Sequence, residues 1–242
     1  MRARWWSPWH ETAGAIVLHV DLAADAEREA RAFDLLDDEE RERWKRFLSA
    51  VARRQFALCR AALRVVLSER LGCTNRALSF GYLEHGKPFA TVGGRRAETG
   101  FNVSHSGRHG LIAIAARDWL GVDVEERVAN RDFEGIGSLV YGPAEQRLLA
   151  AAAGREQVHL FYRLWSMKEA LIKALGAGFS LSPSRFEVPP AMLQGERSGS
   201  FRFPHAPSGE WRLLDLGEPR FAAALAYKAS PPEAQSTVRQ EH

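Results

Sequence analysis

The segment from about residue 157 to 175 constrains the fold most, because its apolar residues return at the three- and four-residue steps of an α-helix. At about 100° per residue, one arc of this helix collects Phe161, Leu164, Trp165, Leu171, Ile172 and Leu175. A second helix is predicted over 51–71 from similar spacing of Phe56, Cys59, Leu63, Val66, Leu67 and Leu71. Gly72 and Gly176 follow the two segments, and glycine ends many helices.

Strand-like segments surround the two helices. The pattern predicts strands at 15–22, 78–83, 101–104, 110–116, 119–125, 185–188, 200–203, 211–216 and 221–227. Further helices are expected over 34–48 and near 143–153, with a turn at 84–88 and a Gly/Arg loop at 93–100. Helices and strands follow one another in mixed order, which predicts an α+β fold.

Length and composition narrow the class of protein. The chain has 242 residues, 45% of them apolar, enough to bury a core in one large domain or two small ones. Its longest apolar runs are far shorter than the roughly 20 residues of a membrane span, and its basic, aromatic start lacks the features of a signal peptide. Cys59 and Cys73 are too few for a disulfide framework. We expect a cytoplasmic protein with no membrane contact and a disordered polar tail from Ser230.

The balance of charge leaves two explanations open. A net charge of +3 and a pI near 9.1 describe a mildly basic protein. Either the whole chain is simply rich in arginine, or it meets an anionic partner such as a nucleic acid, a phosphorylated cofactor or an acidic protein. Composition alone does not choose between them.

A pair of carboxylates lies in the predicted strand at 119–125. Alternation puts Asp123 and Glu125 on one face of that strand, roughly 6.5–7 Å apart along it. A hard cation such as Mg²⁺ would receive oxygen ligands from both and relieve their repulsion. A solvated acidic face on an ordinary amphipathic strand is the alternative.

The long helix carries three charged residues of interest. Lys168 projects from the middle of the apolar arc, and Glu169 lies at its edge on the side of Lys173. One interpretation has Lys168 snorkelling past its neighbours and Glu169 pairing with Lys173 at i,i+4. The other puts all three at the rim of a phosphate and metal site.

Weaker signals come from two turns and the helix at 51–71. The strand at 101–104 ends in Ser104-His105-Ser106-Gly107, whose donors suit phosphate oxygens or simply satisfy local backbone groups. Lys87 stands in an ordinary turn. The helix is expected to present most of its arginines on a solvated face, with one or two free to meet phosphates: Arg53, Arg54, Arg60 and Arg64.

Taken together and in this order, the segments resemble the 4′-phosphopantetheinyl transferase superfamily, in the single-chain form typified by the surfactin-synthetase activator. The resemblance rests on Asn102 to Ser106, Gly121 to Glu125 and Trp165 to Lys173, and it covers about residues 43–188. Gly86-Lys87-Pro88 and Gly178-Phe179-Ser180-Leu181 also fit. It implies two similar α+β halves related by a pseudo-twofold, with the cofactor between them. We expect the halves at 1–117 and 118–229, followed by the tail 230–242.

The resemblance also implies a set of site residues. Asp123, Glu125 and Glu169 match carboxylate ligands of Mg²⁺, and Asp123, Glu169 and Lys173 are the expected catalytic residues. Lys173 matches a lysine that contacts the phosphates of coenzyme A, and Lys168 belongs to the same motif. Lys87, Ser104 and His105 match residues that hold the 3′-phosphate end of the nucleotide, with Arg53 or Arg54 as an added basic contact.

The implied reaction moves phosphopantetheine from coenzyme A to a serine of an apo carrier protein and releases adenosine 3′,5′-bisphosphate. The base would be Glu169 or a metal-bound water. A monomer is expected, and a basic surface would steer acidic carriers. Two other classes remain open. One is an inactive module that binds coenzyme A or a carrier. The other is a basic, metal-dependent nuclease or nucleic-acid-binding protein, although no nucleic-acid motif supports it and we expect no nucleic-acid partner.

Overall fold

The computed structural model describes residues 4–12, 14–129, 133–176, 181–204 and 209–228. The expected tail at 230–242 lies outside these residues, as does most of Gly178 to Leu181. Within them, no helix is both long and apolar enough to cross a membrane. The part of the chain up to residue 117 is called the N-terminal half below, and the part from residue 118 onward the C-terminal half.

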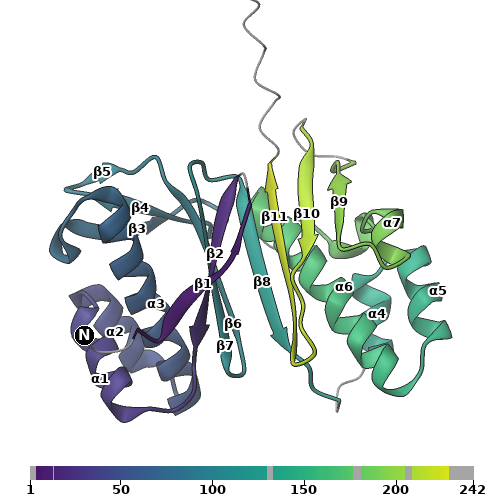
Figure 1. The fold of residues 1–242 in the computed structure, drawn as a ribbon, viewed down its shortest axis with the longest axis horizontal. Helices are drawn as coiled ribbons and strands as arrows, with labels where there is room; N and C mark the ends of the chain where they lie inside the picture. Colours follow the sequence, from purple (N-terminus) through teal and green to yellow (C-terminus); the bar gives the residue numbers. More distant parts are fainter. Residues whose placement is uncertain (1–3, 13, 130–132, 177–180, 205–208, 229–242) are drawn as a thin grey trace, which may run out of the picture.

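The N-terminal half packs three helices against an antiparallel sheet (Figure 1). Its four strands follow the order β1-β2-β7-β6: β1 (Trp6–Glu11), β2 (Ala15–Asp21), β7 (His109–Ala115) and β6 (Gly100–Ser106). The helices are α1 (Ala26–Leu35), α2 (Asp38–Arg46) and α3 (Ala50–Leu71). A separate small sheet holds β3 (Leu78–Tyr82), β4 (Pro88–Val92) and β5 (Arg95–Arg96).

The C-terminal half has the same two layers, and its strand order is β8-β11-β10-β9. The strands are β8 (Leu120–Glu126), β11 (Phe221–Lys228), β10 (Trp211–Asp215) and β9 (Ser198–Phe201). The helices are α4 (Phe133–Val140), α5 (Pro143–Ala151), α6 (Gly154–Leu175) and α7 (Pro190–Leu193). The apolar arc predicted for 157–175 is the buried face of α6, which contacts β8, β10 and β11.

The two halves repeat one topology, as the resemblance implies. Each has a first strand, then helices of which the longest spans 22 residues, then two antiparallel strands. In each sheet the last of these strands lies between the other two, giving β2-β7-β6 and β8-β11-β10. Both 22-residue helices end at a left-handed glycine, Gly72 with φ 60° and Gly176 with φ 73°. The expected α+β fold of two similar halves is therefore confirmed.

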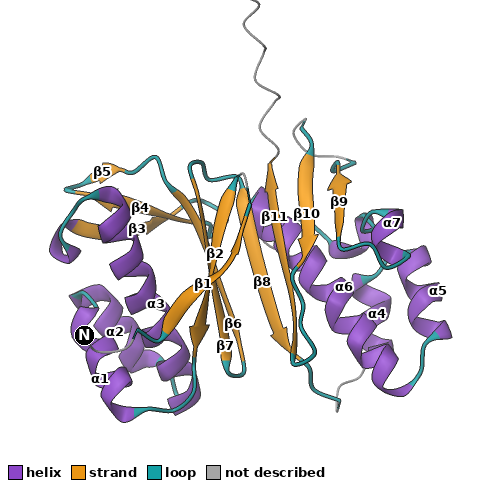
Figure 2. Cartoon of the chain, viewed as in Figure 1, coloured by secondary structure: helices purple, strands orange, loops and turns teal. Residues whose placement is uncertain are grey.

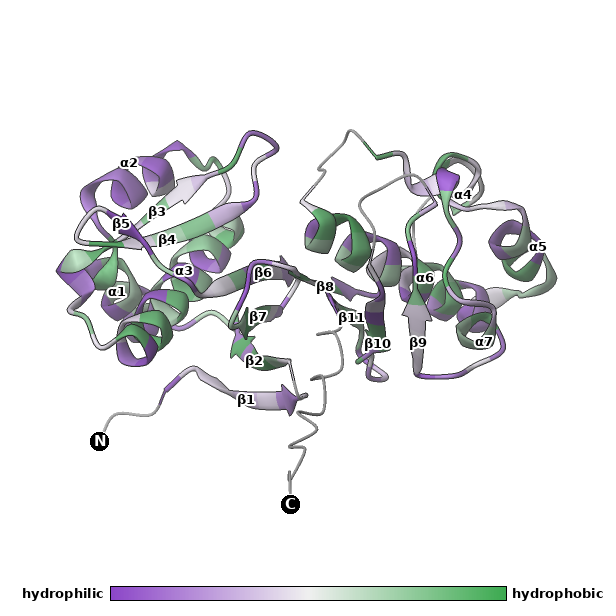
Figure 3. Cartoon of the chain, turned by 90° about the horizontal axis from the view of Figure 1, so that it is seen from above, coloured by the Kyte–Doolittle hydropathy of each residue, from purple (hydrophilic) through white to green (hydrophobic). Residues whose placement is uncertain are grey.

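The sheets meet at the centre of the molecule, with the helices on the outer sides (Figure 2). Hydrophobic residues of β2 and β7 face those of β8 and β11 in a shared core that includes Val17, Leu111, Val122 and Leu225. Figure 3 shows the hydrophobic stretch along β2 and β7 at this junction. The interface therefore contributes a buried apolar core of its own, in addition to the core of each half.

Polar side chains join the edges of the two sheets. The amides of Val122 and Glu126 on β8 donate to Asn102 Oδ1 and Ser106 Oγ on β6, at 2.9 and 3.1 Å. Between them the Val124 amide donates to Ser104 Oγ at 3.4 Å. Alternate side chains of β6 thus replace the backbone carbonyls of a neighbouring strand, which fixes β8 against β6.

Several predicted elements differ from the structure. The segment expected to form one helix at 34–48 contains the end of α1 and the whole of α2. Asp37 separates them, because it begins α2 as its N-cap in a capping box with Glu40. The strand expected at 185–188 is wrong: a 3₁₀ turn, Pro183–Arg185, precedes an irregular stretch there. The sequence analysis also missed β1, α4 and most of α1, whose apolar residues are too few or too irregularly spaced to form a clear period.

Helix α6 packs directly against the backbone of β8 at Gly121. A Cβ built on this residue would lie 2.2 Å from the Ala170 carbonyl oxygen and 2.3 Å from the Ala174 nitrogen. We expect Gly121→Ala to destabilise the protein by about 3 kcal/mol, because backbone atoms of α6 cannot move aside as a side chain can. The measurement is urea unfolding. Gly137→Ala is the control, since its Cβ would meet only Tyr141, at 3.5 Å, and it should leave stability unchanged or raise it.

Candidate functional site

A cavity of about 580 Å³ opens between the two halves. The N-terminal half supplies residues of α2, α3 and β6 and of the turn between β3 and β4, and the C-terminal half supplies the second part of α6. Its lining includes Arg43, Phe56, Arg60, Tyr82, His85, Lys87, His105, Trp165, Glu169 and Lys173. Many of these residues are cationic or aromatic, so the cavity suits an anionic ligand with a flat ring.

Asp123 is the buried centre of the polar cluster beside this cavity. Its side chain is 4% exposed, and Oδ1 accepts hydrogen bonds from Ser104 Oγ at 2.9 Å and Lys173 Nζ at 2.6 Å. Lys173 also donates to Ser104 Oγ at 3.0 Å. Burial raises the pKa of Asp123, while the Lys173 ammonium and the hydrogen bonds oppose that rise. The structure thus brings together three residues that the sequence analysis singled out from three separate segments.

Glu169 lines the cavity one turn before Lys173 on α6. Burial and the negative charge of Asp123 raise the pKa of Glu169, and the charge of Lys173 partly offsets them. A carboxylate whose pKa is raised toward neutrality is a better proton acceptor at working pH than an ordinary one. Glu169 can therefore accept a proton from a group bound in the cavity.

The hydrogen bonds of the carboxylates indicate whether a divalent cation could bind beside the cavity. Asp123 Oδ2 is buried and has no hydrogen-bond partner among the described residues, although a buried carboxylate oxygen normally has one. Glu125, in contrast, accepts a hydrogen bond from Ser106 Oγ at 2.9 Å. Within the described part of the chain, no three acidic, histidine or cysteine side chains converge as a ready metal centre. Asp123 and Glu169 thus suit a hard cation, and Glu125 is held beside them by Ser106.

His105 and Lys87 both lie on the cavity wall. The pKa of His105 is lowered because its ring is partly desolvated and because Lys173 and Arg43 are positive, so the neutral imidazole is favoured. Lys87 is buried, and its Nζ donates to the carbonyls of Ala174 and Leu120 at 2.7 and 3.3 Å. Lys87 therefore ties the β3–β4 turn to the last turn of α6 and to the start of β8.

Lys87 gives the protein a specific pH dependence. Burial lowers its pKa from 10.5 to about 8 in the folded state. Between these values the unfolded chain binds the extra proton, so the free energy of unfolding should rise with pH. We expect the stability difference between wild type and Lys87→Met, measured by urea unfolding, to grow in favour of wild type from pH 8 to 10.5. A difference that is constant or falls over this window would contradict the assignment.

Lys168 lies outside the cavity. Its side chain is 1% exposed, and Nζ pairs with Glu145 at 2.7 Å and donates to the carbonyls of Pro183 and Phe186. Glu145 also accepts from the amides of Gly142 and Val188 at 2.9 Å. The pair joins α6 to α5 and to the chain after the 3₁₀ turn. We therefore assign Lys168 to the core of the C-terminal half, neither snorkelling to solvent nor at the rim of the cavity.

The side chains of Arg53 and Arg54 also lie outside the cavity. Arg53 donates to the Phe47 carbonyl and lies over the ring of Trp44, and Arg54 donates to the Leu22 carbonyl. The arginines that line the cavity are Arg43 and Arg60 instead. Arg60 is one of the four arginines that the sequence analysis named on α3, whereas Arg43 was missed because it lies in the charged last turn of α2.

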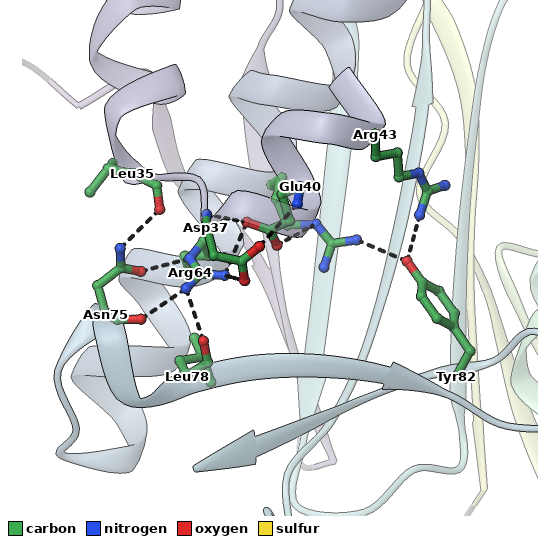
Figure 4. Close-up of polar contacts among 9 residues, drawn as sticks. Leu35, Asp37, Glu40, Arg43, Arg64, Asn75, Leu78 and Tyr82 are labelled. Carbon is green, nitrogen blue, oxygen red and sulfur yellow. Dashed lines mark hydrogen bonds and ion pairs between the residues drawn. The ribbon is translucent and has the colours of Figure 1, made fainter. Parts of the chain in front are cut away.

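The cavity wall around Arg43 and Arg60 is held by a buried network, drawn in Figure 4. The guanidinium of Arg64 is buried and donates to Asp37, Glu40, Asn75 and the Leu78 carbonyl. The second oxygen of Glu40 holds Arg60 Nε at 3.4 Å. Arg60 and Arg43 then both donate to the hydroxyl of Tyr82, at 3.4 and 2.6 Å. Arg64 is thus an exception to the solvated face expected for most arginines of this helix, since all five of its donors are satisfied inside the protein.

Fold and site together define a two-half α+β protein whose acidic and basic residues gather at a cavity between the halves. Comparisons with known sequences also divide the chain into these two halves. The pattern described as the 4′-phosphopantetheinyl transferase superfamily matches residues 120–226, and the one described as 4′-phosphopantetheinyl transferase, N-terminal, matches residues 24–117. Each pattern thus covers most of one half.

Individual relatives place the chain in the same family. The 4′-phosphopantetheinyl transferase Sfp of Bacillus subtilis is 30% identical over 171 residues, which cover 71% of this chain and 74% of Sfp. HetI of Nostoc sp., also named a 4′-phosphopantetheinyl transferase, is 34% identical over 147 residues. A relative from Synechocystis sp. is 35% identical over 146 residues. The chain belongs to the 4′-phosphopantetheinyl transferase superfamily.

The extent of these matches differs between relatives. The matched segment spans 59% of the Synechocystis relative and 61% of HetI. Proteins of this family transfer phosphopantetheine from coenzyme A to carrier proteins and use a divalent metal.

Proposed function

We propose that this protein is a 4′-phosphopantetheinyl transferase that modifies a serine of an apo carrier protein with the phosphopantetheine arm of coenzyme A. The observation that carries the proposal is the cluster of Asp123, Lys173 and Glu169 beside the cavity between the halves. Coenzyme A is a diphosphate with an additional 3′-phosphate, so its binding needs both cations and a site for a metal. The cavity offers both kinds of group in one chain.

The reaction exchanges one phosphorus–oxygen bond for another. The serine oxygen of the carrier forms a bond to the β-phosphorus of coenzyme A, and the bond from that phosphorus to the bridging oxygen breaks. Adenosine 3′,5′-bisphosphate leaves with the bridging oxygen. Glu169 would take the proton of the serine hydroxyl, since its carboxylate lines the cavity in which the serine must bind. Lys173 lies where its ammonium can neutralise charge that develops on the phosphate oxygens.

The divalent cation, proposed to be Mg²⁺, would be held by Asp123 and Glu169 together with Glu125. Its contribution would be to neutralise the diphosphate and stabilise the leaving phosphate. The unpartnered Asp123 Oδ2 supports this assignment, since it is the one carboxylate oxygen of Asp123 that Ser104 and Lys173 do not occupy. Ser104 and Lys173 would keep the Asp123 side chain in position.

The nucleotide end of coenzyme A is proposed to meet Lys87, His105 and Arg43. His105 as a neutral imidazole can donate to or accept from the ligand, and Arg43 supplies a guanidinium fork. Ser104 acts through Asp123 in this proposal. Arg53, Arg54 and Lys168 are left out of the cofactor site because, unlike Lys87, none of them lines the cavity.

We also propose that the halves divide at 117/118 and that the protein works as a monomer. Residues of one chain from both sides of this boundary line the cavity, so no second copy is needed to complete it. Cys59 is a buried free thiol and Cys73 is also unpaired, which suits a reducing, cytoplasmic setting. An excess of basic residues would attract acidic carrier proteins.

The proposal is tested by release of adenosine 3′,5′-bisphosphate from coenzyme A, separated by chromatography, with and without an apo carrier protein. Release that needs the carrier, stops with EDTA and returns with Mg²⁺ is the expected result. The competing function is an inactive module that binds coenzyme A or a carrier. Tight binding of coenzyme A without release in the presence of any carrier would favour that module.

A further inference from the structure

A second cavity, of about 980 Å³, lies in the C-terminal half. It is lined by the first part of α6, the chain just after β8 and the turn between β10 and β11. It shares no lining residue with the cavity between the halves. His159 belongs to the second cavity and Glu169 to the first, ten residues and about 15 Å apart along the helix axis.

Arg127 is the residue that calls for an explanation. Its Nη1 donates to the Glu218 carbonyl at 2.5 Å, but its Nε is buried and has no hydrogen-bond partner among the described residues. Burial also lowers the pKa of its guanidinium, with Asp215 opposing the shift. A buried guanidinium donor without an acceptor is costly, and a bound anion would supply the missing acceptor.

The surroundings of Arg127 have an excess of positive charge. The lining contains five arginines and three carboxylates. The arginines are Arg127, Arg155, Arg163, Arg197 and Arg220, and the carboxylates are those of Glu156, Asp215 and Glu218. Two of the three carboxylates already have partners: Asp215 pairs with Arg163 Nε at 2.7 Å, and Glu218 accepts from Trp9 at 3.2 Å. The three carboxylates thus leave two of the five arginine charges uncompensated.

Two of the arginines are available at the rim. Arg155 and Arg220 are exposed, and within the described part of the chain neither makes an ion pair or a hydrogen bond. His159 is an exposed residue of α6, one turn after Arg155, and its pKa is lowered by partial burial and by Arg127 and Arg163. Guanidinium groups that converge on one space, with an imidazole beside them, are the donors that phosphate oxygens prefer.

We propose that this cavity is a second binding site of the C-terminal half, for a small phosphate-bearing anion. Arg127 would donate from the floor through Nε, and Arg155 and Arg220 would contact the same anion from the rim. Arg163 is held by Asp215 and by the carbonyls of Met192 and Glu196, and it would contribute charge without moving. The site stands independently of the proposed transferase activity.

The experiment titrates inorganic pyrophosphate into the full-length protein labelled at histidine, observed by NMR. His159 reports on the second cavity, while His85 and His105 report on the first. We expect a saturable shift of the His159 signals with a dissociation constant of about 1 mM or lower. No saturable shift of His159 up to about 10 mM would overturn the proposal, whatever His85 and His105 do.

Variants separate the site from general attraction of anions. Replacing both Arg155→Gln and Arg220→Gln alters only exposed side chains, and it should weaken the His159 response about tenfold. Arg127→Gln should weaken it as well. Arg76→Gln is the control, since Arg76 is exposed, makes no ion pair among the described residues and lines neither cavity. An equal loss in the control and in the double variant would contradict a defined site.

Discussion

Lys168→Met is expected to lower the free energy of unfolding by about 3–5 kcal/mol. Lys168 and Glu145 are both almost completely buried, with side-chain exposures of 1% and 0%. Removing the ammonium leaves the Glu145 carboxylate charged in the core, and it leaves the carbonyls of Pro183 and Phe186 without their donor. Urea unfolding at pH 7 measures the loss.

The partner variant distinguishes a broken ion pair from a poorly packed methionine. Glu145→Gln placed on Lys168→Met removes the stranded charge, so the double variant should recover part of the lost stability. A double variant whose two effects simply add would mean that the two charges are not coupled, contrary to their 2.7 Å separation. Because Lys168 lies outside the cavity, any remaining folded protein should bind coenzyme A normally.

Asp123→Asn is expected to lower the kcat/KM of phosphopantetheine transfer by at least about 100-fold. The substitution removes the negative charge between Ser104 and Lys173 while keeping the shape of the side chain. It also removes the buried oxygen that would hold the cation. The measurement is the initial rate of carrier modification at several Mg²⁺ concentrations.

Asp123→Asn should change the stability of the protein much less than its activity. Burial raises the pKa of Asp123, so in the folded protein its ionised form is disfavoured relative to the unfolded chain. Lys173 is 28% exposed, so its ammonium stays partly solvated without Asp123, unlike the fully buried Glu145 that Lys168→Met leaves behind. Replacing Asp123 by a neutral amide should therefore change the free energy of unfolding by no more than about 1 kcal/mol. Asp38→Asn, at an exposed position on α2, is the matched control and should change neither quantity. Full activity in a folded Asp123→Asn would remove Asp123 from the mechanism.

Much of the fold could be predicted because its longest elements carry strong periodic signals. The two 22-residue helices and the central strands follow from apolar spacing alone. The break at Asp37 was missed because a charged stretch can continue a helix or cap a new one, and only the reciprocal contact with Glu40 decides. The pairing of β2 with β7 joins residues 88 to 100 positions apart, which local patterns do not encode.

The site could be predicted only in part for a related reason. Asp123, Glu169 and Lys173 were singled out because their residue types and spacing suggest metal and phosphate chemistry, and they do lie together. Which arginine of a helix enters a cavity depends on how that helix is rotated against its neighbours. Arg53 and Arg60 are the same residue type on the same helix, but only Arg60 lines the cavity between the halves. Likewise, the partner of Lys168 is 23 residues away, on a different helix.

The most direct test of the proposed activity is the intact mass of apo carrier proteins after incubation with the purified protein, coenzyme A and Mg²⁺. A panel should include carriers from fatty-acid, polyketide and peptide synthesis. The proposal predicts that at least one carrier gains the mass of one phosphopantetheine arm, that EDTA prevents the gain and that Asp123→Asn does not support it. No gain on any carrier, with coenzyme A still bound in the cavity between the halves, would contradict the proposed activity.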